Sequence, residues 1–422
     1  MNSIKIKPQM LKGIVDIPPS KSIVLRLILA AFLSAGDCVI QNVKMSDDVE
    51  AMLGAIKILG AKYSYNSKTD TLKIGRLKKA TFANEITIDC FESASVLRFL
   101  IPVSLISKRD VVFLGRGRLM DRPIMPYLNM FKKHGVLCKK QGKKVTVSGQ
   151  LECGIYEICG NISSQFISGL LFALPVLEGD SEIIVTTETE SKSYIEMTLS
   201  VLKKFGIKID KKDDRHFFIK GGQKYIPTNE TAEADYTQAA NFLVAGALGS
   251  DIVCRGLREK SVQGDFEILN IIKSAGGLIE KREGGISARR TAFMHSVTVD
   301  ASNIPDLVPI VAVLLAFCDG ESEIINAGRL RMKESDRLTV ICRELRHLGA
   351  DIREVGDGLK IIGKQVVCES AASASGDHRI AMALSVAALR CENTCVEISG
   401  GEEAVKKSYP EFYEVFKSLY SE

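Results

Sequence analysis

The hydrophobic positions of this chain fall into six long runs that are apolar on nearly every side. Each run opens on a small or polar residue and closes before an acidic or glycine-containing turn, which is typical of a buried helix. A short segment rich in β-branched residues follows each run, and these segments start about 70 residues apart, as strands of a repeating unit would. The six expected helices span residues 20–37, 93–110, 163–180, 235–251, 303–321 and 377–393.

A second helix with interleaved charged positions is expected in every unit, ending at a glycine. The first five of these glycines are 75, 71, 70 and 73 residues apart, at Gly60, Gly135, Gly206, Gly276 and Gly349. A hairpin pattern follows each one, as at residues 61–75 and 350–363. With a strand contributed by the preceding unit, the pattern predicts an α/β (α+β) fold of six βαβαββ repeats, with the apolar helices inside and the amphipathic ones covering them.

The two ends of the chain are expected to meet in one domain. The sixth repeat has no hairpin of its own, and the N-terminal strand segment 3–17 could supply it. Prolines and polar residues mark two crossovers, at Pro18–Pro19 and at residues 226–235. We therefore expect three repeats in a first domain, residues 18–231, and three in a second, residues 1–17 plus 232–422.

The overall composition is that of an ordinary globular protein and indicates no particular class of binding partner. The 422 residues are 46% hydrophobic and 25% charged, and the net charge is only +5. Eleven scattered cysteines suggest free, mostly buried thiols in a reducing compartment, and their spacing fits no zinc template. No signal peptide or membrane-spanning run is evident, so we expect a soluble, cytoplasmic protein without a metal.

Positive charge gathers where the expected inner helices begin. A cation at a helix N-terminus opposes the helix dipole, so stability alone would not select it. A snorkelling lysine or a serine cap explains one such start, but several together favour a cleft for a ligand with phosphate or carboxylate groups. The starts are Lys21, Ser22 and Arg26; Ser93, Ser95 and Arg98; Ser163, Ser164 and Gln165; and Asp377, His378 and Arg379; further cations are Arg116, Arg118, Arg122, Arg329, Arg331, Lys333, Arg337, Lys406 and Lys407.

Two acids stand among these cations. Asp306 opens an apolar helix and Glu334 lies between Lys333 and Arg337. A helix cap and an ion pair are the simplest explanations for them. In a shared cleft, however, such carboxylates could exchange protons with a substrate.

These segments resemble the 5-enolpyruvylshikimate-3-phosphate synthase family, also called 3-phosphoshikimate 1-carboxyvinyltransferases, over essentially the whole chain. The resemblance rests on PPSKSxxxR at Lys21, SDDV at Asp47–Asp48, SxxLR at Arg98, GRxRLMDRP at Arg118, GNISSQF at residues 160–166, SKSY at 191–194, NIPD at Asp306, RLRMKESDR at 329–337, DHR at 377–379 and KSYP at Lys407. It implies a two-domain inside-out α/β barrel with three repeats per domain and the active site in the interdomain cleft.

The resemblance also implies a reaction and its residues. The enolpyruvyl group of phosphoenolpyruvate passes to the 5-hydroxyl of shikimate 3-phosphate by addition and elimination, releasing phosphate, in the shikimate pathway of chorismate and aromatic amino acid biosynthesis. No cofactor or metal is implied, and we expect a monomer whose partners are these two small molecules, with no nucleic acid and no membrane. Asp306 and Glu334, assisted by Lys21, would carry the protons. Shikimate 3-phosphate would bind Lys21, Ser22, Arg26, Ser163, Ser164, Gln165, Ser191, Asp306 and Lys333, and phosphoenolpyruvate would bind Lys21, Ala94, Arg118, Gln165, Arg337, Arg379 and Lys407.

The chain departs from the common family pattern at residue 94. Many relatives have glycine where this chain has Ala94, close to the pocket shared by phosphoenolpyruvate and the inhibitor glyphosate. A methyl group there would take space that the longer inhibitor needs more than the substrate does. We therefore expect natural glyphosate tolerance.

Two alternatives remain open at the level of the sequence. A UDP-N-acetylglucosamine enolpyruvyl transferase would share the fold and the donor, but that family usually has a reactive cysteine in the loop where this chain reads GRGRLMDRP. A non-catalytic nucleic-acid binder could use the same cations, but tryptophan is absent and aromatics are 6% of the chain, which leaves little for base stacking.

Overall fold

The structure is a computed structural model that describes residues 3–34, 36–75, 85–363, 371–391 and 395–420. The chain forms two compact units. The middle unit is Pro19–Ala232, and the terminal unit joins Met1–Pro18 to Glu233–Glu422. Each has its own hydrophobic core.

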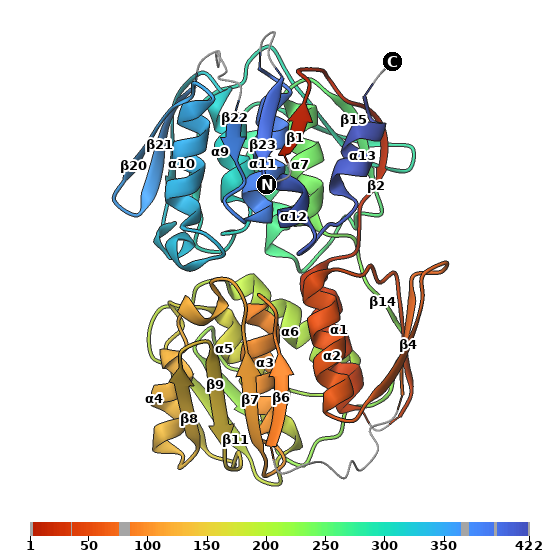
Figure 1. Ribbon diagram of the computed structural model, residues 1–422, viewed down its shortest axis with the longest axis vertical. Helices are drawn as coiled ribbons and strands as arrows, with labels where there is room; N and C mark the ends of the chain where they lie inside the picture. Colours follow the sequence, from red (N-terminus) through yellow and green to blue (C-terminus); the bar gives the residue numbers. More distant parts are fainter. Residues whose placement is uncertain (1–2, 35, 76–84, 364–370, 392–394, 421–422) are drawn as a thin grey trace. The chain divides into compact units, whose positions relative to one another are not determined.

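The middle unit contains three repeats, drawn in red to yellow-green in Figure 1. Its apolar helices α1 (Lys21–Leu33), α3 (Ala94–Ser104) and α5 (Ser164–Ala173) are buried along nearly their whole length. The amphipathic helices α2 (Asp47–Ile58), α4 (Met125–Lys133) and α6 (Lys192–Lys204) keep a charged side exposed, such as Lys203 and Lys204 on α6. The strands are β3 (Cys38–Gln41), β4 (Lys62–Asn66), β5 (Thr71–Gly75), β6 (Glu85–Asp89), β7 (Asp110–Leu114), β8 (Leu137–Gln141), β9 (Lys144–Ser148), β10 (Ile155–Ile158), β11 (Ser181–Val185), β12 (Asp210–Lys211), β13 (His216–Ile219) and β14 (Glu230–Thr231).

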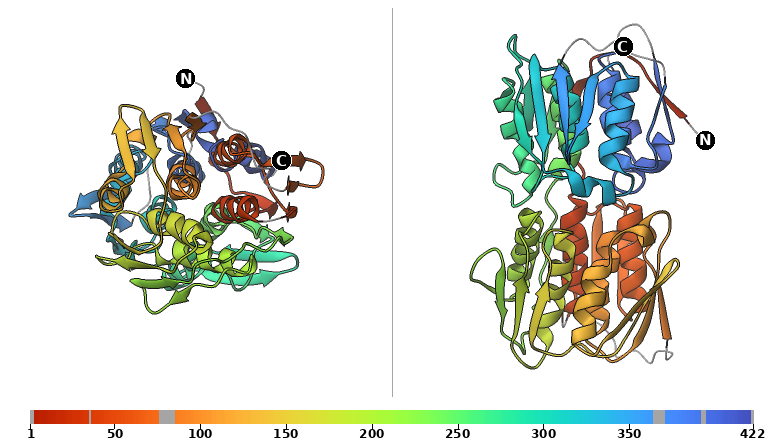
Figure 2. Two further views of the ribbon diagram at one scale, coloured as in Figure 1. Left: turned by 90° about the horizontal axis from the view of Figure 1, so that it is seen from below. Right: turned by 90° about the vertical axis from the view of Figure 1, so that its left-hand side faces the viewer.

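The terminal unit repeats this plan, with a second set of helices packed against sheets (Figures 1 and 2). The apolar helices α7 (Tyr236–Ala247), α9 (Val308–Ala316) and α11 (His378–Ala388) are buried at every residue. The others are α8 (Ile268–Ser274), α10 (Arg337–His347), α12 (Gly401–Val405) and α13 (Phe412–Ser418). The strands are β1 (Ser3–Ile6), β2 (Lys12–Asp16), β15 (Asp251–Arg255), β16 (Leu278–Arg282), β17 (Gly285–Arg289), β18 (Thr298–Asp300), β19 (Gly320–Ile325), β20 (Asp351–Val355), β21 (Gly358–Gly363), β22 (Ala371–Ser373) and β23 (Val396–Ser399).

The described sheets share one arrangement of strand order and direction. The strand that follows each apolar helix is parallel to a lead strand on one side and antiparallel to a hairpin strand on the other, as in the order β6-β7-β9-β8. The lead strand of the first repeat is β14, which pairs in parallel with β3 although it lies near the end of the third repeat. This pairing closes the middle unit, and the predicted repeating α/β architecture is confirmed.

The N-terminal segment serves two repeats, so the expectation that it supplies the missing hairpin of the sixth is only half right. Strand β1 pairs antiparallel with β23, where Ile4 lies opposite Ile398, and so takes the hairpin position. Strand β2 instead pairs in parallel with β15 of the fourth repeat, where Ile14 lies opposite Val253. The reason is that β14, the strand that precedes the fourth repeat, already pairs with β3. Without β2, the edge of β15 would have no parallel partner strand.

Two predicted helices begin differently in the structure. The fifth starts at Val308 and not at residue 303, because Pro309 favours the first helical turn and residues 305–307 form a turn before it. Asp306 therefore lies in that turn. The fourth amphipathic helix starts with a 3-10 turn, η3 (Gly264–Glu267), before α8. The predicted end of the sixth apolar helix at residue 393 lies outside the described residues.

The cysteines are mostly as expected, with one exception. Nine of those described are free thiols. Cys391, however, is disulfide-bonded, and its neighbour Cys395 is free, so the two are not bonded to each other. The expectation of free thiols throughout is wrong at Cys391, because disulfide formation depends on distance in the fold and not on sequence spacing. Among the described residues, no helix has the length and apolar character needed to cross a membrane.

Candidate active site

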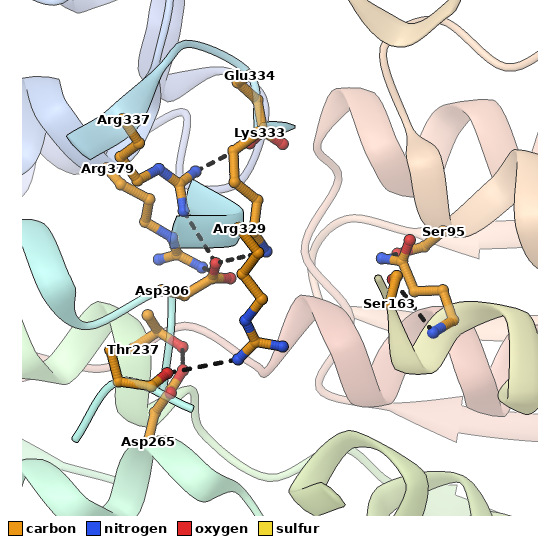
Figure 3. Close-up of polar contacts among 12 residues, drawn as sticks. Ser95, Ser163, Thr237, Asp265, Asp306, Arg329, Lys333, Glu334, Arg337 and Arg379 are labelled. Carbon is orange, nitrogen blue, oxygen red and sulfur yellow. Dashed lines mark hydrogen bonds and ion pairs between the residues drawn. The ribbon is translucent and has the colours of Figure 1, made fainter. Parts of the chain in front are cut away.

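A carboxylate surrounded by cations forms the centre of the site in the terminal unit (Figure 3). Asp306 lies in the turn before α9, and 21% of its side chain is exposed. The guanidinium of Arg337 donates to its Oδ1 at 2.9 Å, and the Lys333 ammonium lies 3.5 Å from the same oxygen. The Arg379 guanidinium lies 3.5 Å from Oδ2. Residues from the starts of three helices, α9, α10 and α11, thus meet at one side chain.

The buried guanidinium of Arg337 connects this carboxylate to two others. Its Nη2 donates to Glu334 at 2.9 Å, and its Nε donates to Asp377 at 3.0 Å. Asp377 is fully buried and also caps α11 by accepting from the Arg379 backbone N–H at 2.9 Å. The ammonium of Lys407 lies 3.4 Å from Glu334. Arg337 therefore holds the starts of α10 and α11 together at the site.

These contacts change the proton affinities of the site. Burial alone would raise the pKa of Asp306, but the charges of Lys333, Arg379 and Arg337 hold it well below its ordinary value. Burial lowers the pKa of Lys333 to about 8, although Asp306 opposes this change. Asp306 is thus a carboxylate at neutral pH, and Lys333 is a cation that loses its proton not far above it.

In the middle unit, one guanidinium organises the starts of α3 and α5. Arg98 donates through Nη1 to Gln165 Oε1 at 2.8 Å and to Ser163 Oγ at 3.3 Å, and it lies over the Phe166 ring at 4.6 Å. Gln165 in turn donates to Ser95 Oγ at 2.9 Å. Ser163 caps α5 by accepting from the Gln165 backbone N–H, and Ser95 and Ser163 appear in Figure 3. The polar side chains at these two helix starts are therefore held in fixed positions.

Arg26 and Lys21 play the corresponding role at the start of α1. The Arg26 guanidinium is 2% exposed and donates to Thr198 Oγ1 at 2.8 Å, to the Ser22 carbonyl at 2.7 Å and to the Tyr194 carbonyl at 3.0 Å. Lys21 pairs with buried Asp48 of α2 at 2.9 Å. Arg26 thereby ties α1 to α6, on which Tyr194 and Thr198 lie.

Ser191 begins α6 with an unusual backbone conformation. It is buried and has a φ of 54°, in the left-handed region that few non-glycine residues adopt. Such conformations are held by the surrounding structure and cluster at functional sites. The position of Ser191 is therefore consistent with a binding role.

The loop after β7 packs on the segment that precedes Ala94. The backbone N–H of Arg116 donates to the Phe91 carbonyl at 2.7 Å, and its guanidinium lies 4.2 Å from the Phe91 ring centroid. Gly117 has a φ of 51°, and a Cβ there would overlap the Glu92 carboxylate. Ala94 is the first residue of α3 and is buried, whereas Arg118 is exposed in the loop.

The structure brings candidate residues together in the terminal unit and forms separate groups of them in the middle unit. Contacts in the terminal unit join Asp306, Lys333, Glu334, Arg337, Arg379 and Lys407. In the middle unit, Ser163 and Gln165 share Arg98, Arg26 contacts Ser22, and Ser164 is buried beside Ser163 at the start of α5.

The sequence pattern singled out Arg98 and Asp377 at helix starts, but the family resemblance assigned neither of them to a substrate. Their signal was present, since each belongs to a charged motif at the start of an apolar helix. The described residues contain no group of three or more His, Cys, Asp or Glu arranged to hold a metal ion.

Comparison with known proteins assigns the family. Residues 6–416 match the EPSP synthase family, whose members are 3-phosphoshikimate 1-carboxyvinyltransferases. The 3-phosphoshikimate 1-carboxyvinyltransferase of Clostridium acetobutylicum is 46% identical, over 99% of this chain and 97% of its own. That of Clostridium perfringens (strain ATCC 13124) is 45% identical, over 99% and 98%. The chain belongs to the EPSP synthase family.

Solved structures agree with this EPSP synthase assignment. An EPSP synthase from Acinetobacter baumannii has a TM-score of 0.79 at 25% identity, covering 99% of this chain and 98% of its own. The enolpyruvyl transferase NikO from Streptomyces tendae, at 17% identity and a TM-score of 0.77, shares the fold. As an EPSP synthase, the enzyme transfers the enolpyruvyl group of phosphoenolpyruvate to shikimate 3-phosphate in the shikimate pathway. The predicted family, enzyme class and reaction are confirmed.

Proposed function

We propose that Asp306 and Glu334, together with Lys21, carry the proton transfers of this reaction. The observation that carries the proposal is the setting of Asp306, an ionised carboxylate held by three cations on residues of the family motifs. A carboxylate fixed in this way can accept a proton at a defined atom. Glu334 shares Arg337 with Asp306, so the two carboxyl groups are coupled through one guanidinium.

The chemistry consists of an addition and an elimination. In the addition, the 5-hydroxyl oxygen bonds to C2 of phosphoenolpyruvate while a base removes the hydroxyl proton and an acid protonates C3, so that the methylene becomes a methyl group. In the elimination, a proton leaves that methyl group, the carbon–carbon double bond forms again and the C2–O bond to phosphate breaks. The acid of the first step is the base of the second, which a pair of carboxyl groups and a lysine can provide.

The same proposal assigns the binding residues. Both substrates carry a phosphate and a carboxylate group, which cationic side chains bind. Shikimate 3-phosphate also carries hydroxyl groups, which serine side chains can bind by hydrogen bonds. Arg98 and Arg26 would fix the side chains around them, Arg26 also acting as a ligand. Shikimate 3-phosphate would contact Lys21, Ser22, Arg26, Ser163, Ser164, Gln165, Ser191, Asp306 and Lys333, and phosphoenolpyruvate would contact Lys21, Ala94, Arg118, Gln165, Arg337, Arg379 and Lys407.

We further propose that the enzyme tolerates glyphosate and acts as a cytoplasmic monomer without nucleic acid. The buried methyl group of Ala94 at the first position of α3 supports the tolerance. Both sets of binding residues come from a single chain, which supports a monomer. Light scattering coupled to size-exclusion chromatography tests the monomer, since a dimer mass would contradict it.

The experiment that tests the assignment measures phosphate release from phosphoenolpyruvate. We expect release with shikimate 3-phosphate and none with UDP-N-acetylglucosamine. Asp306→Asn and Glu334→Gln should each lower kcat by about 10²-fold to 10⁴-fold, the usual contribution of one acid or base. Asp319→Asn, which changes an exposed carboxylate of the same unit, is the matched control. Wild-type kcat in both site variants would remove these residues from the chemistry.

A further inference from the structure

The terminal unit holds a buried carboxyl group that the reaction outlined above does not use. Asp265 lies in η3 and is 4% exposed. Its Oδ2 accepts a hydrogen bond from the hydroxyl of Thr237, in the first turn of α7. Its Oδ1 is buried and has no hydrogen-bond partner within the part of the chain that the structure describes. Figure 3 shows Asp265 and Thr237 below Asp306. A buried carboxyl group with one unpartnered oxygen is costly if it is ionised.

The charges that act on Asp265 come from three elements. They are Asp235 at the cap of α7, Asp306 in the turn before α9, and Arg379 in the first turn of α11. Burial and repulsion by Asp306 outweigh the hydrogen bond from Thr237 and the attraction of Arg379, and they raise the pKa of Asp265 to about 7. The group therefore changes its charge near neutral pH.

The two protonation states of Asp265 act differently on its neighbours. As an anion, Asp265 repels the Asp306 carboxylate and attracts the Arg379 guanidinium, which lies 3.5 Å from Asp306. As a neutral acid, Asp265 exerts neither effect, so the ion pair between Arg379 and Asp306 is kept. The protonated form is thus the one that preserves the site, and the arrival of anionic substrates favours it because added negative charge disfavours a second carboxylate.

We propose that Asp265 is a positioning residue that takes up a proton when the anionic substrates bind, and that it thereby keeps Arg379 directed at Asp306 and phosphoenolpyruvate. This inference rests on the proposed assignment of Asp306 and Arg379 to the substrates. The proton comes from solvent, resides on a carboxyl oxygen of Asp265 and returns to solvent on product release. No bond between Asp265 and a substrate forms or breaks.

The proposal predicts that the KM for phosphoenolpyruvate depends on pH more strongly than kcat does. Above neutral pH the free enzyme has lost this proton, so binding must restore it. The KM for phosphoenolpyruvate should therefore rise by up to about tenfold between pH 7 and 8.5, as one titrating group allows, while kcat at saturation changes less. In Asp265→Asn, which keeps the size and stays neutral, the rise should be less than about twofold.

Thr237 provides a second variant with a distinct expectation. Thr237→Val removes the hydroxyl that favours the ionised carboxyl group, so the KM rise should move to higher pH. Thr237→Ser keeps the donor and should reproduce the wild-type profile. Calorimetry in two buffers of different ionisation heat measures the number of protons taken up when shikimate 3-phosphate binds at pH 7. This number should be smaller for Asp265→Asn than for the wild type, by at most about half a proton per site.

The outcomes separate this inference from the proposed function. A wild-type KM profile and wild-type proton uptake in Asp265→Asn would overturn the role of Asp265, as would a shift to lower pH in Thr237→Val. If Asp265→Asn does not fold, as judged by its thermal transition, the Thr237 variants decide alone. Full activity in Asp306→Asn would instead remove the assignment of Asp306. Asp319→Asn serves as the control for the loss of a carboxylate in this unit.

Discussion

At the scale of single residues, the charge state of a side chain depends on neighbours that are distant in sequence. Asp306 and Lys333 are 27 positions apart and form an ion pair, and Arg337 reaches Asp377 over 40 positions. The sequence could predict that these residue types belong to a site, because they stand in charged motifs at helix starts. It could not predict that Arg337 would be shared by three carboxylates, since that requires the fold.

Lys333 is expected to set the alkaline limit of shikimate 3-phosphate binding. Burial lowers its pKa to about 8, so the side chain is a cation below this pH and becomes neutral as the pH rises through it. Because the cation attracts the anionic substrate, the KM for shikimate 3-phosphate should rise above about pH 8. Lys333→Arg keeps the charge at higher pH and should move this rise beyond pH 9. An alkaline KM profile unchanged in Lys333→Arg would contradict the prediction.

Ala94 is expected to determine sensitivity to glyphosate. Replacing Ala94→Gly removes one buried methyl group at the first position of α3 and should lower the inhibition constant about tenfold to a hundredfold, the range for one such group in a pocket. Ala31→Gly, at a buried position late in α1, is the control for loosening an apolar helix. Low-micromolar inhibition of the wild type, competitive with phosphoenolpyruvate, would refute the proposed tolerance.

At the scale of helices and strands, most elements were predictable because each satisfies local rules. The apolar helices are hydrophobic all round and are buried, and the amphipathic ones end at glycines that have positive φ, such as Gly60 and Gly349. The exceptions arise where partners matter. Strand β2 pairs with β15 because an edge there required a strand, which no local pattern reveals.

The close approach of α3 and α5 gives a test of packing. A Cβ at Gly169 would overlap the Arg98 carbonyl and the Tyr127 hydroxyl, which itself donates to that carbonyl at 2.8 Å. Gly169→Ala should therefore lower the free energy of unfolding by about 1–3 kcal/mol, measured by chemical denaturation. Gly54→Ala in α2 is the matched control, since its added Cβ would meet no atom within 4 Å apart from its chain neighbours and the nearby backbone of α2. It should be neutral or stabilising by up to about 1 kcal/mol, and equal losses in both variants would contradict the packing explanation.

At the scale of the whole molecule, the chain order does not follow the grouping of the repeats. The terminal unit is assembled from both ends of the chain, since β1 pairs with β23 and β2 with β15. The candidate residues are divided between the two units, and each unit contributes several cations.

The sequence by itself determined the repeating unit, the burial of the apolar helices and the family motifs, because hydrophobic period, turn glycines and motif spacing are local properties. The tertiary structure alone decided which strand completes which sheet, and how Asp306 and Asp265 are charged. Strand partners are chosen by whichever edge remains unpaired in the fold. Proton affinities are set by burial and by charges brought close from several repeats. Both depend on distances in space that the order of residues does not contain.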